Sequence, residues 1–144
     1  MSSNDTACTL RFGWGDVGAV LLDESGKLRF PNLPTKPGLY QFRVHGPKGD
    51  VGRYVGETNN LQRRFAHYRN PGPTQPTNLR LNALLKEVLG KGGNVELAIA
   101  IDSAWITRNG QEEIANLRNK NVRRLFENVA LITGQARDVL DLNK

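Results

Sequence analysis

Three stretches of the chain have residue patterns that predict β-strands, and in two of them hydrophobic and polar residues alternate. The first stretch, residues 38–45, turns every second side chain toward an apolar face, which is the period of a half-buried strand. Residues 51–56 are rich in β-forming side chains, and residues 94–101 alternate again. A polar turn with two glycines at residues 46–50 joins the first two stretches. We therefore expect an antiparallel hairpin and a third strand.

Apolar residues recur with a helical period in three other stretches, which predicts helices there. The first helix begins at Asn59 or Asn60 as its capping residue and ends before the Asn-Pro-Gly-Pro sequence at residues 70–73. The second helix covers residues 78–89, and the third covers residues 111–133. The predicted fold is therefore α/β of the α+β type, with a small, three-stranded, mainly antiparallel sheet flanked by helices.

The N-terminal region predicts a hairpin of its own. Strands are expected at residues 17–23 and 27–30, with a glycine-containing turn between them. Prolines at positions 31, 34 and 37 then keep the chain extended before the next strand. We expect residues 1–35 to form an N-terminal β-hairpin extension that packs on a main domain of residues 36–144.

Composition and charge narrow the functional class. The 144 residues are 38% hydrophobic and 24% charged, and no apolar run approaches the roughly 20 residues of a membrane helix. We expect a cytoplasmic protein with no membrane partner, because the chain begins without a recognisable secretory signal. Twenty basic and fourteen acidic residues give a net charge of +6, which favours nucleic acid as the partner.

The first predicted helix presents a basic edge beside its apolar face. At about 100° per residue, Phe65 and Tyr68 share the face that packs on the sheet, and Arg64 lies on the edge of that face. Arg63 points away, toward solvent. Arg64 is therefore the better candidate for a fixed guanidinium that binds phosphate, and a rim arginine that covers apolar surface is the alternative. His67 lies beside Arg64 and can bind a phosphate or a water, and a solvated side chain on the flank of the helix is the alternative.

Two tyrosines fall on neighbouring strands of the predicted hairpin. Tyr40 and Tyr54 can share one side of the sheet, where a tyrosine is ordinarily a packing residue with a tethered hydroxyl. To act as a general base near neutral pH, a phenol with a pKa of about 10 needs positive charge close by. Arg53, Arg64 or a bound metal can supply that charge. Both interpretations stay open at this point.

Glu127 stands in an apolar part of the last predicted helix. Six of the eight residues from 125 to 132 are apolar, so a carboxylate there needs a partner. One candidate is Arg123, one turn earlier, in a salt bridge. The other is a hard divalent cation such as Mg²⁺, which commonly takes one protein carboxylate and keeps several waters.

Together these features resemble the GIY-YIG nucleases, and in motif style most closely the excision-repair and stand-alone members. The similarity is carried by Gly-Leu-Tyr at residues 38–40, Tyr-Val-Gly at residues 54–56, the helix that follows and the segment that begins at Glu127. It extends from residue 31 to the C-terminus. The resemblance implies an endonuclease that hydrolyses phosphodiester bonds in DNA with Mg²⁺ or Mn²⁺.

The resemblance also assigns roles to individual residues. Arg64 matches the family's catalytic arginine, Tyr68 falls where members carry a tyrosine or a histidine, and Glu127 matches the metal-binding glutamate. Asn143 matches the late asparagine of some members. The expected catalytic set is Tyr40, Tyr54, Arg64, His67, Tyr68 and Glu127, and the expected substrate-binding residues are Arg53, Arg63 and Asn143.

One residue departs from the family pattern. Glu57 stands directly after the second tripeptide, where the excision-repair branch carries a lysine. An acid at this position can alter how the attacking water is activated. A nucleic-acid-binding module of the same fold without catalysis is therefore the alternative function. The family's enzymes often add a DNA-binding or dimerisation region, so a homodimer or a partner protein is an option on duplex substrates.

Overall fold

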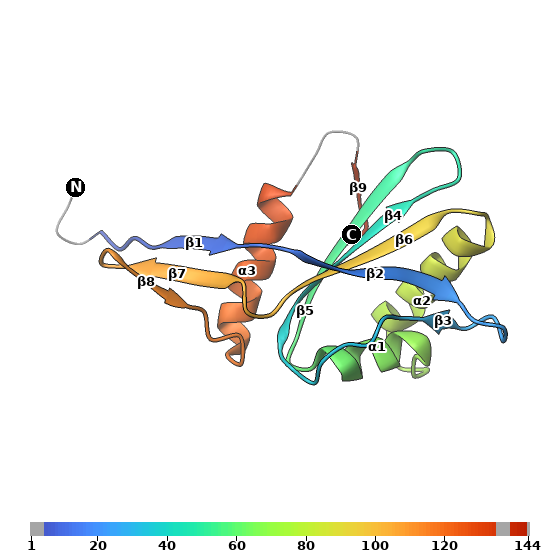
Figure 1. Cartoon of the computed structure of the whole chain (residues 1–144), viewed down its shortest axis with the longest axis horizontal. Coiled ribbons are helices and arrows are strands. Elements are labelled where there is room, and N and C mark those ends of the chain that lie inside the picture. The colour runs from blue at the N-terminus through green and yellow to red at the C-terminus, as the bar shows by residue number, and fades with distance from the viewer. Residues whose placement is uncertain (1–4, 135–138, 144) are drawn as a thin grey trace.

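The computed structural model describes residues 5–134 and 139–143, which form two β-sheets and three helices (Figure 1). The main sheet has six strands in the order β3-β2-β6-β4-β5-β9, and the second sheet has three in the order β1-β7-β8. In chain order the elements are β1 Thr9–Phe12, β2 Gly15–Leu22, β3 Leu28–Arg29, β4 Gly38–His45, β5 Val51–Thr58, α1 Leu61–Arg69, α2 Pro76–Gly90, β6 Asn94–Ala100, β7 Ala104–Arg108, β8 Gln111–Ile114, α3 Lys120–Thr133 and β9 Val139–Asp141. The mixed α and β class predicted from the sequence is confirmed. Among the described residues, no helix has the length and apolar character needed to span a membrane.

The predicted hairpin lies at the centre of the main sheet. β4 pairs antiparallel with β5 along its whole length and pairs antiparallel with β6 on its other side. In the β4–β5 pairing, Tyr40 lies opposite Gly56, and Phe42 lies opposite Tyr54. Because side chains alternate along a strand, Tyr40 and Tyr54 point to the same face of the sheet.

The prediction of a three-stranded sheet is wrong, because further strands join the central three. β2 pairs antiparallel with β6 across a bulge between Asp16 and Gly18, β3 pairs with β2, and β9 pairs parallel with β5. The N-terminal hairpin thus contributes to the main sheet. Alternation within a segment predicts a strand, but it does not say which distant strand will pair with it. The domain boundary expected after residue 35 stays a prediction.

The C-terminal helix is shorter than predicted. Residues 111–114 form β8, which pairs with β7 through a turn where Asn109 and Gly110 have positive φ angles of 50° and 77°. An Asn-Gly pair with two positive φ angles is typical of a two-residue hairpin turn. α3 begins only after Asn119, whose side chain accepts hydrogen bonds from the backbone amides of Asn121 and Val122 and so caps the helix. The second sheet, which β8 completes, is therefore an addition to the predicted fold.

Helices cover both faces of the main sheet. α1 and α2 lie over the face that carries Tyr40 and Phe42, where the larger core cluster forms (Figure 1). α3 lies over the opposite face, where Phe126 packs in a second cluster with Leu39. On the first face, Phe65 of α1 meets Tyr40 edge to face, with ring centroids 5.0 Å apart. α1 and α3 therefore approach β5 from opposite faces of the sheet.

Candidate active site

Three tyrosine side chains meet on the face of the sheet beneath α1. Tyr40 comes from β4, Tyr54 from β5 and Tyr68 from the buried face of α1. The rings of Tyr40 and Tyr54 lie 6.3 Å apart, and those of Tyr40 and Tyr68 lie 6.0 Å apart. The hydroxyls of Tyr40 and Tyr68 are hydrogen-bonded to each other. Strand pairing and helix packing together therefore bring three phenols into one buried cluster.

Gly56 leaves the space that the Tyr40 ring occupies. It lies opposite Tyr40 in the β4–β5 pairing, and a Cβ atom at this position would collide with the hydroxyl end of the ring. The glycine of the Tyr-Val-Gly sequence therefore has a steric role, because any larger residue would displace the ring.

Burial raises the pKa of two of these phenols. Tyr40 is only 1% exposed, and burial, followed by the neighbouring Tyr68 and Tyr54, holds its pKa well above the ordinary value. Burial is also the main reason that the pKa of Tyr68 is raised. Arg64 lowers the pKa of both hydroxyls without reversing these shifts. Tyr54 is 9% exposed, so it has the best access to water of the three.

Arg64 lies half-buried on the edge of α1, where its helical spacing predicts it. Burial by itself lowers the pKa of its guanidinium, but Tyr40, Tyr68, Tyr54 and Glu57 act in the opposite direction and the net pKa is raised. Arg64 therefore stays charged while it lies within electrostatic reach of all three phenols.

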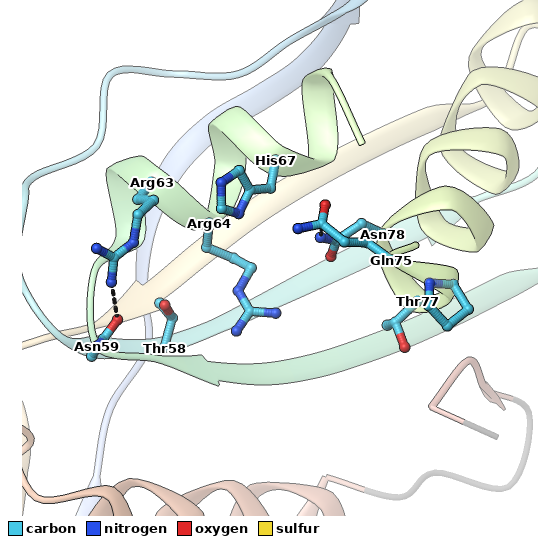
Figure 2. A pocket seen from close by; sticks show the side chains of 9 residues that line it. Thr58, Asn59, Arg63, Arg64, His67, Gln75, Thr77 and Asn78 are labelled. Carbon is cyan, nitrogen blue, oxygen red and sulfur yellow. Dashed lines mark hydrogen bonds between the residues drawn. The ribbon is translucent and has the colours of Figure 1, made fainter. Parts of the chain in front are cut away.

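A polar groove of about 360 Å³ opens beside Arg64, between α1, the end of β5 and the start of α2 (Figure 2). Its lining includes Arg63, Arg64 and His67 on one side and Gln75, Thr77 and Asn78 on the other. Arg63 and His67 are both exposed, and Arg63 donates from Nη2 to Asn59 Oδ1 at 2.7 Å. Three basic residues named from the sequence thus line one cavity.

Glu127 approaches β5 from the opposite face of the sheet. It is half-buried on α3, and its pKa is raised, first because burial penalises the charged carboxylate and second because the Glu57 carboxylate lies near. Arg124, the backbone amide of Glu57 and Arg64 lower the pKa of Glu127. Glu127 therefore lies near Glu57 of β5, and Arg64, on the helix over the opposite face, has the smallest of these effects on its pKa.

The salt bridge considered for Glu127, with Arg123, does not form. Arg123 instead donates from Nε to Glu57 Oε2 at 2.6 Å, and from Nη1 to the carbonyls of Leu117 and Arg118 at 3.0 Å each. Alternation along β5 turns the Glu57 side chain toward α3, where it meets the guanidinium of Arg123. Glu127, one helical turn after Arg123, therefore does not have Arg123 as its partner.

The Arg123→Met variant is expected to lose about 3–5 kcal/mol of unfolding free energy, because removing one partner of a buried ion pair leaves the other charge unpaired. The Arg123 and Glu57 side chains are only 6% and 15% exposed. Urea denaturation measures the loss. Arg124→Met, at the exposed neighbouring position, is the control and should change stability by less than about 0.5 kcal/mol. Equal stability of the two variants would contradict the buried pair.

Arg53 and Asn143, like Arg63, are expected to bind substrate, and all three form hydrogen bonds with other residues of the chain. Asn143 Nδ2 donates to the Val55 carbonyl at 2.6 Å, and its Oδ1 accepts from the Val55 amide at 2.9 Å. Arg53 donates from Nε to Gln41 Oε1 on the face opposite the tyrosines. The expectation that Arg53 supplies charge to the two strand tyrosines is therefore wrong, because adjacent residues of a strand point to opposite faces. Contact of Arg53 or Asn143 with substrate stays a prediction.

The donor set around Glu127 suits a hard cation with few protein ligands. Within residues 5–134 and 139–143, no group of three or more His, Cys, Asp or Glu side chains is placed to hold a metal ion. Glu127 and the nearby Glu57 provide two carboxylates, one of which is held by Arg123. Mg²⁺ is usually bound by one or two carboxylates together with waters and substrate phosphates. These residues therefore fit a cation whose binding the substrate completes.

Two features of the site were not predicted from the sequence: the ion pair of Glu57 with Arg123, and the wall of the groove that contains Gln75. Alternation along β5 already turns Glu57 away from Tyr54, toward the face that a helix can cover, and a carboxylate buried there needs a cation. No comparable signal marks Gln75, because only the packing of α2 beside α1 brings it near Arg64.

The fold recurs in a solved structure of a different protein. The structure of a mutant of bacteriophage T4 EndoII is similar to this chain with a TM-score of 0.54 and 19% sequence identity, over 81% of this chain and 86% of that chain. A scan against protein-family models finds no match, and a search of curated proteins finds no significant match. At this level of identity the similarity shows that the two chains share a fold.

Proposed function

We propose that this protein is a metal-dependent endonuclease of the GIY-YIG type, which hydrolyses phosphodiester bonds in DNA. The observation that carries the proposal is the placement of the half-buried Arg64 beside three clustered tyrosines, with the Glu127 carboxylate near the end of β5. A guanidinium can bind a phosphate, a carboxylate can hold a metal ion, and a phenol with some access to water can orient the attacking water, and these are roles that phosphodiester hydrolysis uses. The fold shared with EndoII, whose name is that of an endonuclease, supports the same activity.

Arg64 would bind the scissile phosphate. Its planar fork can donate two parallel hydrogen bonds to phosphate oxygens. Its half-buried position strengthens the attraction as negative charge grows on the phosphate, because a partly buried site has a lower effective dielectric constant than water. His67, which lines the same groove, would add a hydrogen bond to the substrate.

Tyr54 is the better candidate to orient the attacking water. Tyr40 is buried, its hydroxyl is bonded to that of Tyr68 and its pKa is raised, and all three facts oppose its ionisation. We assign Tyr40 and Tyr68 to a hydrogen-bonded pair that positions Tyr54 and Arg64. Tyr54 keeps some exposure on the same face and can accept a hydrogen bond from a water there.

Glu127 would hold the cation, with Glu57 near it. When bound, Mg²⁺ or Mn²⁺ supplies positive charge that stabilises the leaving oxygen and helps to bind the phosphate. Glu127 suits this role because Arg123 is engaged by Glu57 and by two backbone carbonyls. Arg123 thereby neutralises one of the two carboxylates, which reduces the repulsion that Glu57 exerts on Glu127.

Wild-type protein with Mg²⁺ is expected to convert supercoiled plasmid into nicked circles, and EDTA should abolish the conversion. Agarose electrophoresis over a time course measures both results. If two copies act together on a duplex, the proportion of linear product should rise with protein concentration. Absence of any metal-dependent product on plasmid, flapped and branched DNA would contradict the proposed activity.

A second candidate function is a nucleic-acid-binding module of the same fold without turnover. It is favoured by the burial of Tyr40 and by the second negative charge that Glu57 brings near Glu127. The net charge of +6 is sufficient for salt-dependent binding to a phosphate backbone. This function predicts binding that weakens as salt increases, with no metal-dependent product on any substrate.

A further inference from the structure

The groove beside Arg64 is larger than a single phosphate requires. Its volume of about 360 Å³ falls within the range of about 300–1,000 Å³ that is usual for small-ligand pockets. In Figure 2 the Arg64 guanidinium lies on one side, and Gln75, Thr77 and Asn78 lie across from it. The space between them can hold a nucleotide next to the phosphate that Arg64 would bind.

Gln75 is held in one orientation by its neighbours. Its Oε1 accepts hydrogen bonds from the Gly72 amide at 2.9 Å and from Asn78 Nδ2 at 3.0 Å. Asn78 is itself only 7% exposed, so the pair is fixed in the wall of the groove. Within the described residues, Gln75 Nε2 donates no hydrogen bond. Its two hydrogens are therefore available to a ligand.

Arg63 provides positive charge at the exposed rim of the same groove. One hydrogen bond, from Nη2 to Asn59 Oδ1, steadies its side chain and leaves its other N–H donors available. The described residues that line the groove include three basic side chains and no aspartate or glutamate. Arg63 is thus placed to attract a phosphate that is distinct from the one assigned to Arg64.

We propose that this groove binds the nucleotide that flanks the scissile phosphate. Arg63 binds the flanking phosphate, and the Gln75 amide, with the Thr77 hydroxyl, donates to acceptors on the edge of the flanking base. The inference rests on the proposed function, because Arg64 sets the position of the scissile phosphate. An amide with two free hydrogens finds acceptors on every base, so the groove gives a preference among flanking bases and not a strict sequence requirement.

Binding to labelled oligonucleotide duplexes in EDTA tests the inference without cleavage. Arg63→Gln and Gln75→Ala are each expected to raise Kd about 10-fold, because one good contact to a phosphate or base edge corresponds to about that factor. Arg63→Gln should also reduce the slope of log Kd against log salt by about one unit, whereas Gln75→Ala should leave the slope unchanged. Lys91→Gln, an exposed cation at the far end of α2, is the control and should bind as wild type does.

Duplexes that lack one base separate the two contacts. One duplex lacks the base on the 5′ side of the cleavage site, and another lacks the base on the 3′ side. On the duplex that lacks the base contacted by Gln75, Gln75→Ala should no longer weaken binding, whereas Arg63→Gln should weaken it as before. Equal Kd values for wild type, Arg63→Gln and Gln75→Ala on every duplex would overturn the inference. If both variants bind more weakly and the wild-type protein never cleaves DNA, the proposed endonuclease activity is contradicted, but binding of a nucleotide in the groove is still supported.

Discussion

The Glu127→Gln variant is expected to lose Mg²⁺-dependent plasmid cleavage by a factor of about 10³ or more. Glutamine keeps the volume of the side chain but removes the negative charge that attracts a hard cation. Loss of the cation removes several kcal/mol of transition-state stabilisation, and each 1.4 kcal/mol corresponds to about tenfold in rate. Initial rates on supercoiled plasmid at several Mg²⁺ concentrations measure the effect.

Glu87→Gln is the matched control for this variant. Glu87 is an exposed glutamate of α2 that pairs with Lys91, so its replacement should leave cleavage unchanged. Isothermal titration with Mn²⁺ gives a second readout, in which Glu127→Gln should bind more weakly and Glu87→Gln should bind as wild type does. Cleavage by Glu127→Gln within fivefold of wild type would rule out a cation at this carboxylate.

The Arg64→Met variant is also expected to lose cleavage by a factor of about 10³, because an arginine that stabilises transferring phosphate is worth about 10³–10⁵ in rate. Methionine retains the apolar stem that covers the edge of α1 and removes the charge and the planar fork. Arg64→Lys keeps the charge without the fork and should fall between wild type and Arg64→Met. Single-turnover rates at saturating protein separate this loss from weaker binding.

Arg80→Met is the matched control for Arg64→Met. Arg80 is an exposed arginine of α2 outside the groove, so its loss should leave the single-turnover rate unchanged. Circular dichroism and urea denaturation check that each variant is folded. A folded Arg64→Met that retains the wild-type single-turnover rate would show that this guanidinium has no part in the reaction.

The parts of the site that follow local geometry could be predicted from the sequence. Alternation along β4 and β5 put Tyr40 and Tyr54 on one face, and the register between these strands agrees. Helical spacing put Tyr68 on the buried face of α1 with Arg64 at its edge, and the burial of α1 agrees. These features depend on strand period, helix period and one short turn, which are properties of neighbouring residues.

The parts that depend on distant pairing could not be predicted in the same way. β2 joins the main sheet through β6, and residues 111–114 form a strand because β7 lies beside them. Arg123 binds Glu57, 66 residues earlier, in place of Glu127 one turn away on its own helix. In each case tertiary packing selects the partner, and helix or strand periodicity carries no information about that choice.

Glu127 is less enclosed on α3 than the apolar residues around it in the sequence suggest. The apolar sequence around it predicts a carboxylate that needs a partner, yet Leu125 is 42% exposed and Ile132 is 72% exposed. Phe126 and Ala130 are the residues of this stretch that are fully buried. Glu127 therefore lies beside the buried face and not within it, which leaves its carboxylate accessible to a cation.

The central claim is that Arg64 and Glu127, from helices on opposite faces of the sheet, serve one cation-dependent site beside Tyr54. Anomalous scattering from a crystal soaked in Mn²⁺ tests this claim most directly. We expect one Mn²⁺ bound to a Glu127 carboxylate oxygen, on the side that faces Arg64 and Tyr54. A crystal with no Mn²⁺ at Glu127, or with the Glu127 carboxylate turned away from Arg64, would contradict it.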